Sequence, residues 1–344
     1  MQLEYFKHPI GNFGDDLNAW IWDALLPGWQ DWDDNVTLIG VGTLLNDTVL
    51  APYRDRRILV AGSGVGYGSG PPRQPLPPGW DIRVVRGPHS ARMLGLSEDR
   101  GAIDPAALLP DLPEFEGIPK SGPPIFVPHV SKARSVDWDM LCRRAGLGFV
   151  SPQGEARSVI RRIAAAPLVV AESMHAAIIA DAFRVPWIPV RFSPRFHAEK
   201  WQDWAASLEM TIDIPPLFPL LNRLRGLRGG RLRKVEVPGR SGATDAVEAM
   251  VPSGAGRPVS SRLKTMVRQM VMVQELRRAA RRRPQLSDPE ILARKRQTYR
   301  QIMAEVIHDY ATLRYKNVPM PPPLWGCASQ RRTTLNRLRE TSTT

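Results

Sequence analysis

Cysteine is scarce in this chain, which has 344 residues and two cysteines, Cys142 and Cys327. They lie far apart and match no metal-ligand spacing, so the sequence indicates neither a disulfide framework nor a zinc site. Long hydrophobic runs are also missing. No segment approaches the roughly 18 apolar residues of a membrane span, and the N-terminal residues lack the pattern of a secretory signal. We therefore expect a cytoplasmic protein in a reducing compartment.

Most of the chain carries no excess charge. The formal net charge is +13, but residues 221–300 contain 20 Lys and Arg against 6 Asp and Glu, so the remaining residues are nearly neutral. Such a basic segment could face anionic lipid, nucleic acid or only solvent. With 43% hydrophobic residues, the composition is that of a folded protein long enough for two domains.

Short apolar runs alternate with helical patterns along residues 1–111, as in a doubly wound parallel sheet. Strands are predicted at 3–6, 36–41, 58–61 and 82–85, and helices near 17–26 and 90–96. A Pro- and Gly-rich stretch at 112–124 has the composition of an interdomain linker.

The alternation resumes along residues 125–214. Strands are predicted at 125–127, 148–150, 168–170 and 187–190, and helices at 136–145, 155–165, 174–183 and 201–208. The sequence therefore predicts an α/β protein with two Rossmann-like domains and a cleft between them.

The pattern changes from residue 215 onward. Residues 215–258 are basic and rich in Gly and Pro, which predicts a flexible segment. Residues 259–329 are predicted to form a helical extension, with a basic amphipathic helix at 262–283 and a helix at 288–313 that packs on the fold. Residues 330–344 are predicted to be a disordered tail.

His175 stands where a buried strand, 168–170, turns into a helix. Ligands of open α/β sheets bind at the carboxyl ends of the strands, and helix N-termini favour anions. His175 is thus well placed to meet an anionic substrate, although a packed structural histidine would show the same spacing.

The loop from Gly11 to Asn18 follows the first strand. Gly11 and Gly14 permit a tight turn whose N–H groups could cradle a phosphate or a sugar hydroxyl, and Asn12 and Asp15 supply polar side chains. The alternative is a loop in which Asp15 or its neighbour caps the following helix.

Two further loops follow predicted strands. The glycine-rich segment 62–68, which includes Gly64, weakly matches a dinucleotide-binding fingerprint, and a flexible loop lining the cleft is the preferred interpretation. Arg86 ends the strand at 82–85, where its guanidinium could bind a carboxylate or phosphate, or simply form a surface ion pair.

Six short motifs occur in an order that points to a family. They are 11–18, Gly42-Thr43-Leu44-Leu45, 62–68, 85–90, Asp104-Pro105-Ala106 and 172–187. On these motifs, which cover roughly residues 1–210, the chain resembles the bacterial polysaccharide pyruvyl transferases, specifically the subgroup that decorates exopolysaccharides such as succinoglycan.

The resemblance implies a GT-B-like fold and an enzyme that uses phosphoenolpyruvate to install a pyruvate ketal on a sugar. It places the family's histidine at His175 and an arginine that binds phosphoenolpyruvate at Arg86. The family often has an arginine two residues before this histidine, where this chain has Ser173, so that cationic contact would come from elsewhere, such as Arg184 or Arg191.

The implied chemistry suggests roles for the candidates. His175 could protonate the methylene carbon of phosphoenolpyruvate or hold its phosphate, and Asp15 could accept a proton from the attacking hydroxyl. No metal and no cofactor beyond the co-substrate is expected. The predicted substrate-binding residues are Arg86, Asn12, Gly11, Gly14, Ser173, Met174 and Gly64.

The expected acceptor is a lipid-linked oligosaccharide at the inner face of the cytoplasmic membrane, where the helix at 262–283 could dock on anionic lipid, or else stay solvated or packed. Two rival functions remain open. One is a GT-B glycosyltransferase that uses a nucleotide sugar. The other is a non-enzymatic basic binding protein, although the basic segment lacks any nucleic-acid-binding motif and no nucleic acid is expected.

Overall fold

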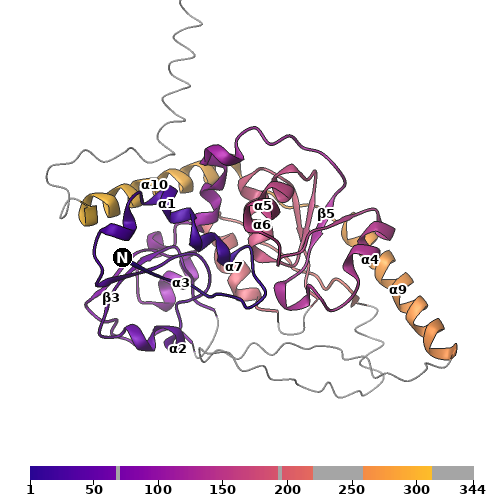
Figure 1. The fold of residues 1–344 in the computed structure, drawn as a ribbon, viewed down its shortest axis with the longest axis horizontal. Coiled ribbons are helices and arrows are strands. Elements are labelled where there is room, and N and C mark those ends of the chain that lie inside the picture. Colours follow the sequence, from indigo (N-terminus) through magenta and orange to yellow (C-terminus); the bar gives the residue numbers. More distant parts are fainter. Residues whose placement is uncertain (67–69, 193–195, 220–258, 312–344) are drawn as a thin grey trace, which may run out of the picture.

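The computed structural model describes residues 1–66, 70–192, 196–219 and 259–311. Within these ranges the chain forms two four-stranded sheets, one in the order β1-β2-β3-β4 and the other in the order β6-β5-β7-β8. Every pairing in both sheets is parallel. The predicted α/β chain with parallel sheets is therefore confirmed (Figure 1).

All eight predicted strands are present, with ends that differ by a few residues. They are β1 (Gln2–Glu4), β2 (Val36–Ile39), β3 (Arg57–Ala61), β4 (Trp80–Val84), β5 (Ile125–Val127), β6 (Gly148–Phe149), β7 (Val169–Ala171) and β8 (Trp187–Pro189). Strands such as β5 and β7 are buried along their whole length, which explains their continuous apolar sequences.

Short helices connect the strands. They are α1 (Ile21–Leu25), α2 (Asp47–Leu50), α3 (Pro88–Met93), α4 (Trp138–Ala145), α5 (Ala156–Ala165), α6 (Met174–Ala182) and α7 (Ala198–Ser207). Helix α6 is buried at every position, in keeping with its apolar sequence on all sides.

The predicted single helix at 17–26 is wrong. The chain forms a 3₁₀ turn at Asp15–Ala19 and then α1, with Trp20 at φ −149° between them. Asn18 causes the break, because its amide donates to the Val41 carbonyl at 3.0 Å and accepts from the Val41 N–H at 2.8 Å. These bonds tie the turn to the chain just beyond β2.

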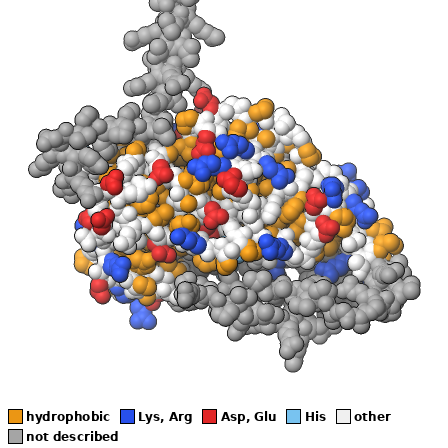
Figure 2. Space-filling model, in the orientation of Figure 1, with side chains coloured by type: hydrophobic (Ala, Val, Ile, Leu, Met, Phe, Trp, Pro, Cys, Tyr) orange, Lys and Arg blue, Asp and Glu red, His pale blue; other side chains and the backbone are white. Residues whose placement is uncertain are grey.

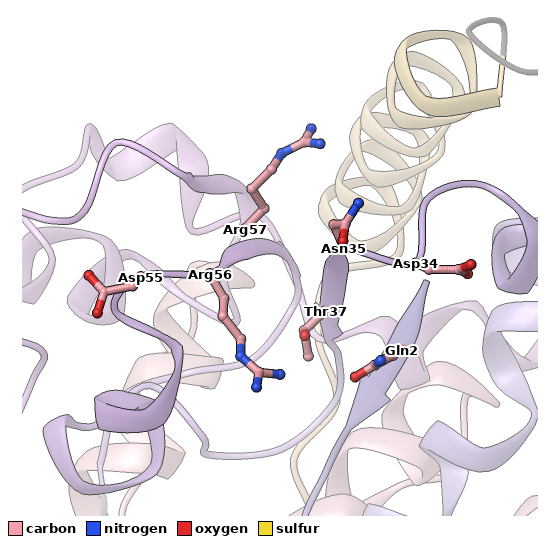
Figure 3. Close-up of a pocket in the computed structure, with 7 residues that line it drawn as sticks. All are labelled: Gln2, Asp34, Asn35, Thr37, Asp55, Arg56 and Arg57. Atoms are coloured by element: carbon pink, nitrogen blue, oxygen red, sulfur yellow. The ribbon is translucent and has the colours of Figure 1, made fainter.

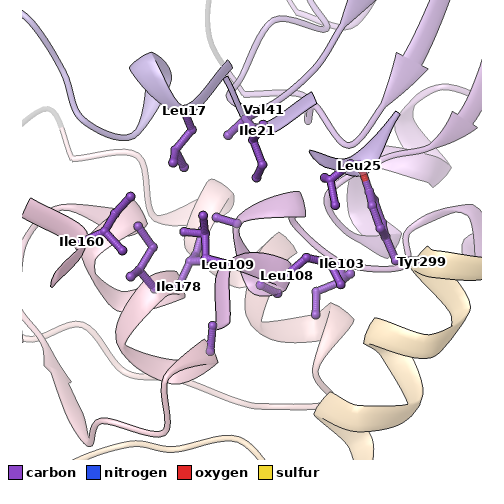
Figure 4. Packing of buried hydrophobic residues seen from close by; sticks show 14 of the residues in the cluster. Leu17, Ile21, Leu25, Val41, Ile103, Leu108, Leu109, Ile160, Ile178 and Tyr299 are labelled. Atoms are coloured by element: carbon purple, nitrogen blue, oxygen red, sulfur yellow. The ribbon is translucent and has the colours of Figure 1, made fainter. Parts of the chain in front are cut away.

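The two sheets share one hydrophobic cluster (Figure 4). Leu17 and Val41 come from the first half of the chain, and Ile160 and Ile178 from the second. The segment 112–124 links the two sheets, and its Leu112 and Phe115 belong to the same cluster. The boundaries of two separate domains stay a prediction.

Helix α10 (Pro289–Ala311) returns from the C-terminal part of the chain to the first sheet (Figure 1). The hydroxyl of Tyr299 donates to the Ala61 carbonyl at the end of β3, at 2.7 Å, and Arg296 and Arg300 both pair with Asp111. The prediction that this helix packs on the fold is confirmed.

Helix α9 (Val259–Ala279) lies at the other end of the molecule and packs on α4 through Met272, Val273 and Leu276. Basic side chains at this end of the molecule donate hydrogen bonds to main-chain carbonyls; Arg277, for example, donates to the Arg144 carbonyl. None of the helices in the described ranges is long and apolar enough to cross a membrane. The predicted flexible segment at 215–258 is wrong for its first residues, because Leu217 and Phe218 are fully buried in the hydrophobic cluster of the second sheet. The rest of that prediction, at 220–258, and the predictions for 312–329 and 330–344 lie outside the described residues.

Candidate functional site

The predicted site residues gather at the carboxyl ends of strands from both sheets. Gly11–Asp15 follow β1, Gly64 follows β3, Arg86 follows β4 and Ser173–His175 follow β7. The two edges meet, because the Phe13 N–H donates to the Pro152 carbonyl at 2.9 Å. The strand order of the second sheet reverses between β5 and β7, and such a switch point is where open α/β sheets bind ligands.

His175 is the second residue of α6 and lies directly against Gly14. A Cβ atom on Gly14 would come within 2.1 Å of the imidazole Nδ1, so only glycine leaves room for the ring. Ser173 caps α6 by accepting from the Ala176 N–H, and Met174 is buried beside it. The structure thus brings the 11–18 loop and His175 together.

The imidazole of His175 is 8% exposed, and its Nε2 has no hydrogen-bond partner among the described residues. Burial, and after it the positive charges of Lys200 and Arg86, together lower the pKa of His175 to about 3. His175 is therefore neutral at pH 7 in the free protein, within a positive electrostatic environment that favours an anion.

A buried carboxylate fixes the loops around His175. Glu172 accepts from the His129 N–H at 3.1 Å and from the Phe192 N–H at 2.7 Å. It thereby joins the loops that follow β5, β7 and β8. Glu172 is fully buried, and these two N–H groups give each of its carboxyl oxygens a hydrogen-bond partner.

Arg86 is fully buried, and the protein itself occupies its guanidinium. Two of its N–H groups donate to Asp203, and the others donate to Val65, Gly42 and Thr43. All five guanidinium N–H donors are thus in use. Direct binding of a substrate by Arg86 stays a prediction, and it would require one of these bonds to break.

Gly64 makes room for this arginine. A Cβ atom at Gly64 would lie 2.4 Å from the Arg86 Cζ, so the guanidinium lies flat against the backbone of this loop. The glycine therefore has a packing role in the structure, beside its predicted contact with substrate. The tip of the loop, 67–69, lies outside the described residues.

Asp15 and Asn12 face each other in the loop after β1. The Asn12 Nδ2 donates to the Asp15 carboxylate at 2.5 Å, and the Asn12 N–H donates to Asp16 at 2.9 Å. Gly11 supplies the turn, with φ at +81°. Asp15 is half-buried and lies beside Gly42, at the same edge of the sheet as Arg86.

Neither arginine that was expected to supply the cationic contact missing at Ser173 is among the residues that contact His175 in the structure. Arg184 follows the far end of α6, where it donates to Ser287 and pairs with Asp181. Arg191 is exposed, and its backbone pairs with residues 215–217. The cation that acts on His175 most strongly is instead Lys200, from α7.

Sequence reasoning missed Lys200 and Asp203, although α7 carries a signal. Both residues lie on the apolar face of the helix, three positions apart and together with Trp204. Lys200 is 8% exposed and Asp203 is 3% exposed. Charged residues on a buried helix face seldom occur without a partner or a function.

The other edge of the first sheet carries a polar depression (Figure 3). Gln2, Thr37 and Arg57 line it at the amino ends of β1, β2 and β3. None of the predicted site residues lies there. In the described part of the chain, no group of three or more His, Cys, Asp and Glu side chains is arranged to hold a metal ion.

Comparison with known proteins identifies the family of the chain. The pattern of the polysaccharide pyruvyl transferase family matches residues 7–194, which include every predicted site residue. The chain therefore belongs to the polysaccharide pyruvyl transferase family and is a transferase. It is also 37% identical to the succinoglycan biosynthesis protein ExoV of Rhizobium meliloti (strain 1021), over 90% of this chain and the whole of that protein.

The close contact between Gly14 and His175 can be tested with a double-mutant cycle. Gly14 has helical backbone angles, so Gly14→Ala introduces no backbone strain, and its cost comes from the imidazole. We expect a loss of about 1–3 kcal/mol in the free energy of unfolding, measured with urea, in the wild type. In the His175→Ala background the cost should be smaller, because only the Cβ of residue 175, 2.8 Å from the same position, remains. An equal cost in both backgrounds would show that the two residues do not touch.

Proposed function

We propose that the protein transfers the pyruvyl group of phosphoenolpyruvate to a sugar of an exopolysaccharide repeat unit, as a ketal, with release of phosphate. Family membership and the relative that is named a succinoglycan biosynthesis protein support pyruvyl transfer to an exopolysaccharide. The observation that carries the proposal is the position of His175. It is buried in a positive environment, where the edges of both sheets meet.

The reaction balances with groups at this edge. A proton adds to the methylene carbon of phosphoenolpyruvate, two sugar hydroxyl oxygens bond to its central carbon, and the bond to the phosphate oxygen breaks. The protons balance, because the two sugar hydroxyls lose two protons in total, while the methylene carbon gains one and the released phosphate gains the other. The site must therefore deliver a proton, accept a proton and hold a phosphate.

His175 is the proposed acid. A bound dianion raises the pKa of a nearby imidazole, so the donor itself can bring a proton onto His175. Asp15 is the proposed acceptor of a hydroxyl proton, since it is half-buried in the loop that contacts His175. Apart from phosphoenolpyruvate as co-substrate, we propose no cofactor or metal.

We further propose that the two sheets belong to two Rossmann-like domains arranged as in GT-B enzymes, with the donor bound between them. The contact from Phe13 to Pro152 and the packing of Gly14 on His175 support this arrangement, because each joins the carboxyl edge of one sheet to that of the other.

Phosphate release tests the proposal. We expect the wild type to release phosphate from phosphoenolpyruvate only with a lipid-linked oligosaccharide acceptor. The rate constant kcat of His175→Asn should fall by about 10²–10⁴, the usual contribution of a general acid. His308→Asn, which changes an exposed histidine on α10, should keep the wild-type rate. An unchanged rate for His175→Asn would exclude His175 from the mechanism.

We also propose that the acceptor is reached at the inner face of the cytoplasmic membrane, with α9 resting on anionic lipid. Met266, Val267 and Met270 of α9 are each at least 50% exposed, and exposed Lys264 lies next to them in the helix. Hydrophobic side chains lie beside Lys and Arg side chains at this end of the molecule (Figure 2). An apolar patch flanked by cations suits anionic lipid.

Flotation with vesicles tests this contact. The wild type should float with vesicles that contain phosphatidylglycerol and stay unbound with pure phosphatidylcholine. Met266→Ser with Met270→Ser should abolish flotation, because burial of their side chains is lost. Met93→Ser changes a similarly exposed methionine on α3 and should float like the wild type. Equal flotation of the double variant and the wild type would contradict the proposal.

A further inference from the structure

Asp104 is a buried acid that the proposed reaction does not use. It lies at the start of a 3₁₀ helix, Pro105–Asp111, where its Oδ1 accepts from the Ala106 N–H at 2.9 Å. The residue is fully buried, and its other oxygen, Oδ2, has no hydrogen-bond partner among the described residues. Buried carboxylates are normally stabilised by hydrogen bonds or a paired cation, so this position is unfavourable for a negative charge.

Three parts of the fold meet around Asp104. Its neighbour Pro105 packs on the loop after β3, where a Cβ atom at Gly62 would come within 2.3 Å of the proline Cγ. The 3₁₀ helix packs along α6. Burial, and after it the negative charge of Asp104, raises the pKa of Tyr299 in α10. Asp104 thus lies where the first sheet, α6 and α10 come together.

Two charged residues of the candidate site act on Asp104 in opposite directions. The guanidinium of Arg86 favours its charged form, and the carboxylate of Asp203 opposes it. Arg86 makes no hydrogen bond to Asp104, because all five of its N–H donors are used by other groups. An ionised Asp104 would therefore add a second carboxylate near one arginine that is already paired.

We propose that Asp104 is a pH-sensitive element that controls how tightly α7 docks on the first sheet. As a neutral carboxylic acid, it leaves the pair between Arg86 and Asp203 undisturbed. As a carboxylate, it attracts the guanidinium and repels the Asp203 carboxylate, so the pair that docks α7 weakens. The inference goes beyond the proposed reaction and does not depend on it, because it concerns the stability of the fold.

The direction of the pH dependence follows from the burial of Asp104. Burial is the main cause that raises its pKa to about 6, and Asp203 acts in the same direction, against the Ala106 N–H and Arg86. An aspartate in an unfolded chain has a pKa of about 3.9. The folded protein therefore holds this proton more tightly than the unfolded chain does. The resulting stability is complete below about pH 4 and is lost as the pH rises through about 6.

The other titratable groups on these elements do not give the same dependence. They are His175 and Asp181 on α6, and Asp111 at the end of the 3₁₀ helix with Arg296 and Arg300 of α10. His175 is neutral in the free protein, while Asp181 and Asp111 are each paired with arginine. Among these groups and Asp104, only Asp104 changes its charge near pH 6.

Urea unfolding of the full-length protein at about pH 5 and about pH 7.5 tests the inference. Asp104→Asn keeps the size of the side chain and an acceptor for the Ala106 N–H, and it cannot ionise. Between the two pH values, the unfolding equilibrium constant of the wild type should rise about tenfold relative to that of Asp104→Asn, because only the wild type loses a proton that the fold holds.

Two further variants serve as controls. Asp55→Asn removes an exposed carboxylate from a turn, so it changes the net charge equally and should keep the pH dependence of the wild type. Asp104→Ser is a second neutral variant that can still cap the 3₁₀ helix, and it should show the same reduced pH dependence as Asp104→Asn.

Hydrogen exchange tests the link from Asp104 to α7. The proteins are compared at equal pH, because exchange itself is faster at higher pH. At about pH 7.5 the backbone amides of residues 198–207 should exchange faster in the wild type than in Asp104→Asn. At about pH 5, where Asp104 is protonated in the folded wild type, the two rates should agree.

Either measurement can overturn the inference. If the wild type and both neutral variants show the same pH dependence of unfolding, Asp104 does not hold a proton in the folded protein, and the inference is overturned. If their pH dependence differs but α7 exchanges equally in the wild type and Asp104→Asn at about pH 7.5, the control of α7 through Arg86 and Asp203 is overturned.

Discussion

The ion pair between Arg86 and Asp203 is the interaction on which the candidate site depends. It is buried on both sides, with an N–O distance of 3.0 Å. Arg86 also bonds to the loops after β2 and β3, while Asp203 bonds to the start of α3. One pair of side chains thus fixes three loops of the first sheet and the helix that carries Lys200. Losing one partner of such a buried pair generally costs about 3–5 kcal/mol, because the other charge is left uncompensated.

This pair also explains why the two cations of the site, Arg86 and Lys200, differ in their surroundings. Asp203 compensates Arg86, whose donors are all bonded to the protein, so Arg86 mainly positions the surrounding loops. Lys200 comes from the same helix, one turn before Asp203, and its charge acts on His129 and His175. The positions of both cations therefore depend on the docking of α7.

The sequence predicted much of the scaffold. Short apolar runs located all eight strands, although only β2, β5, β7 and β8 are buried along their whole length, and the rule that ligands bind at carboxyl ends led to Asp15 and His175. The break at Trp20 was missed, because it depends on hydrogen bonds from Asn18 to Val41, which lies 23 residues away. Local periodicity contains no information about such contacts.

The partners of the candidate residues were harder to predict for the same reason. Arg86 and Asp203 are 117 residues apart, and their contact exists only once α7 packs between the two sheets. The contact of Tyr299 with the Ala61 carbonyl likewise depends on the return of α10 to the first sheet. Only the charged residues on the buried face of α7 could have been noticed in the sequence. They indicate that the helix has buried charges, but not which residues these charges contact.

A crystal structure of the protein with phosphoenolpyruvate tests the central claim most directly, namely that an anionic donor binds where the two sheets meet. The account predicts the ligand at the carboxyl edges of both sheets, with an oxygen within hydrogen-bond distance of His175. Binding in the depression at the opposite edge, beside Thr37 and Arg56, would contradict it.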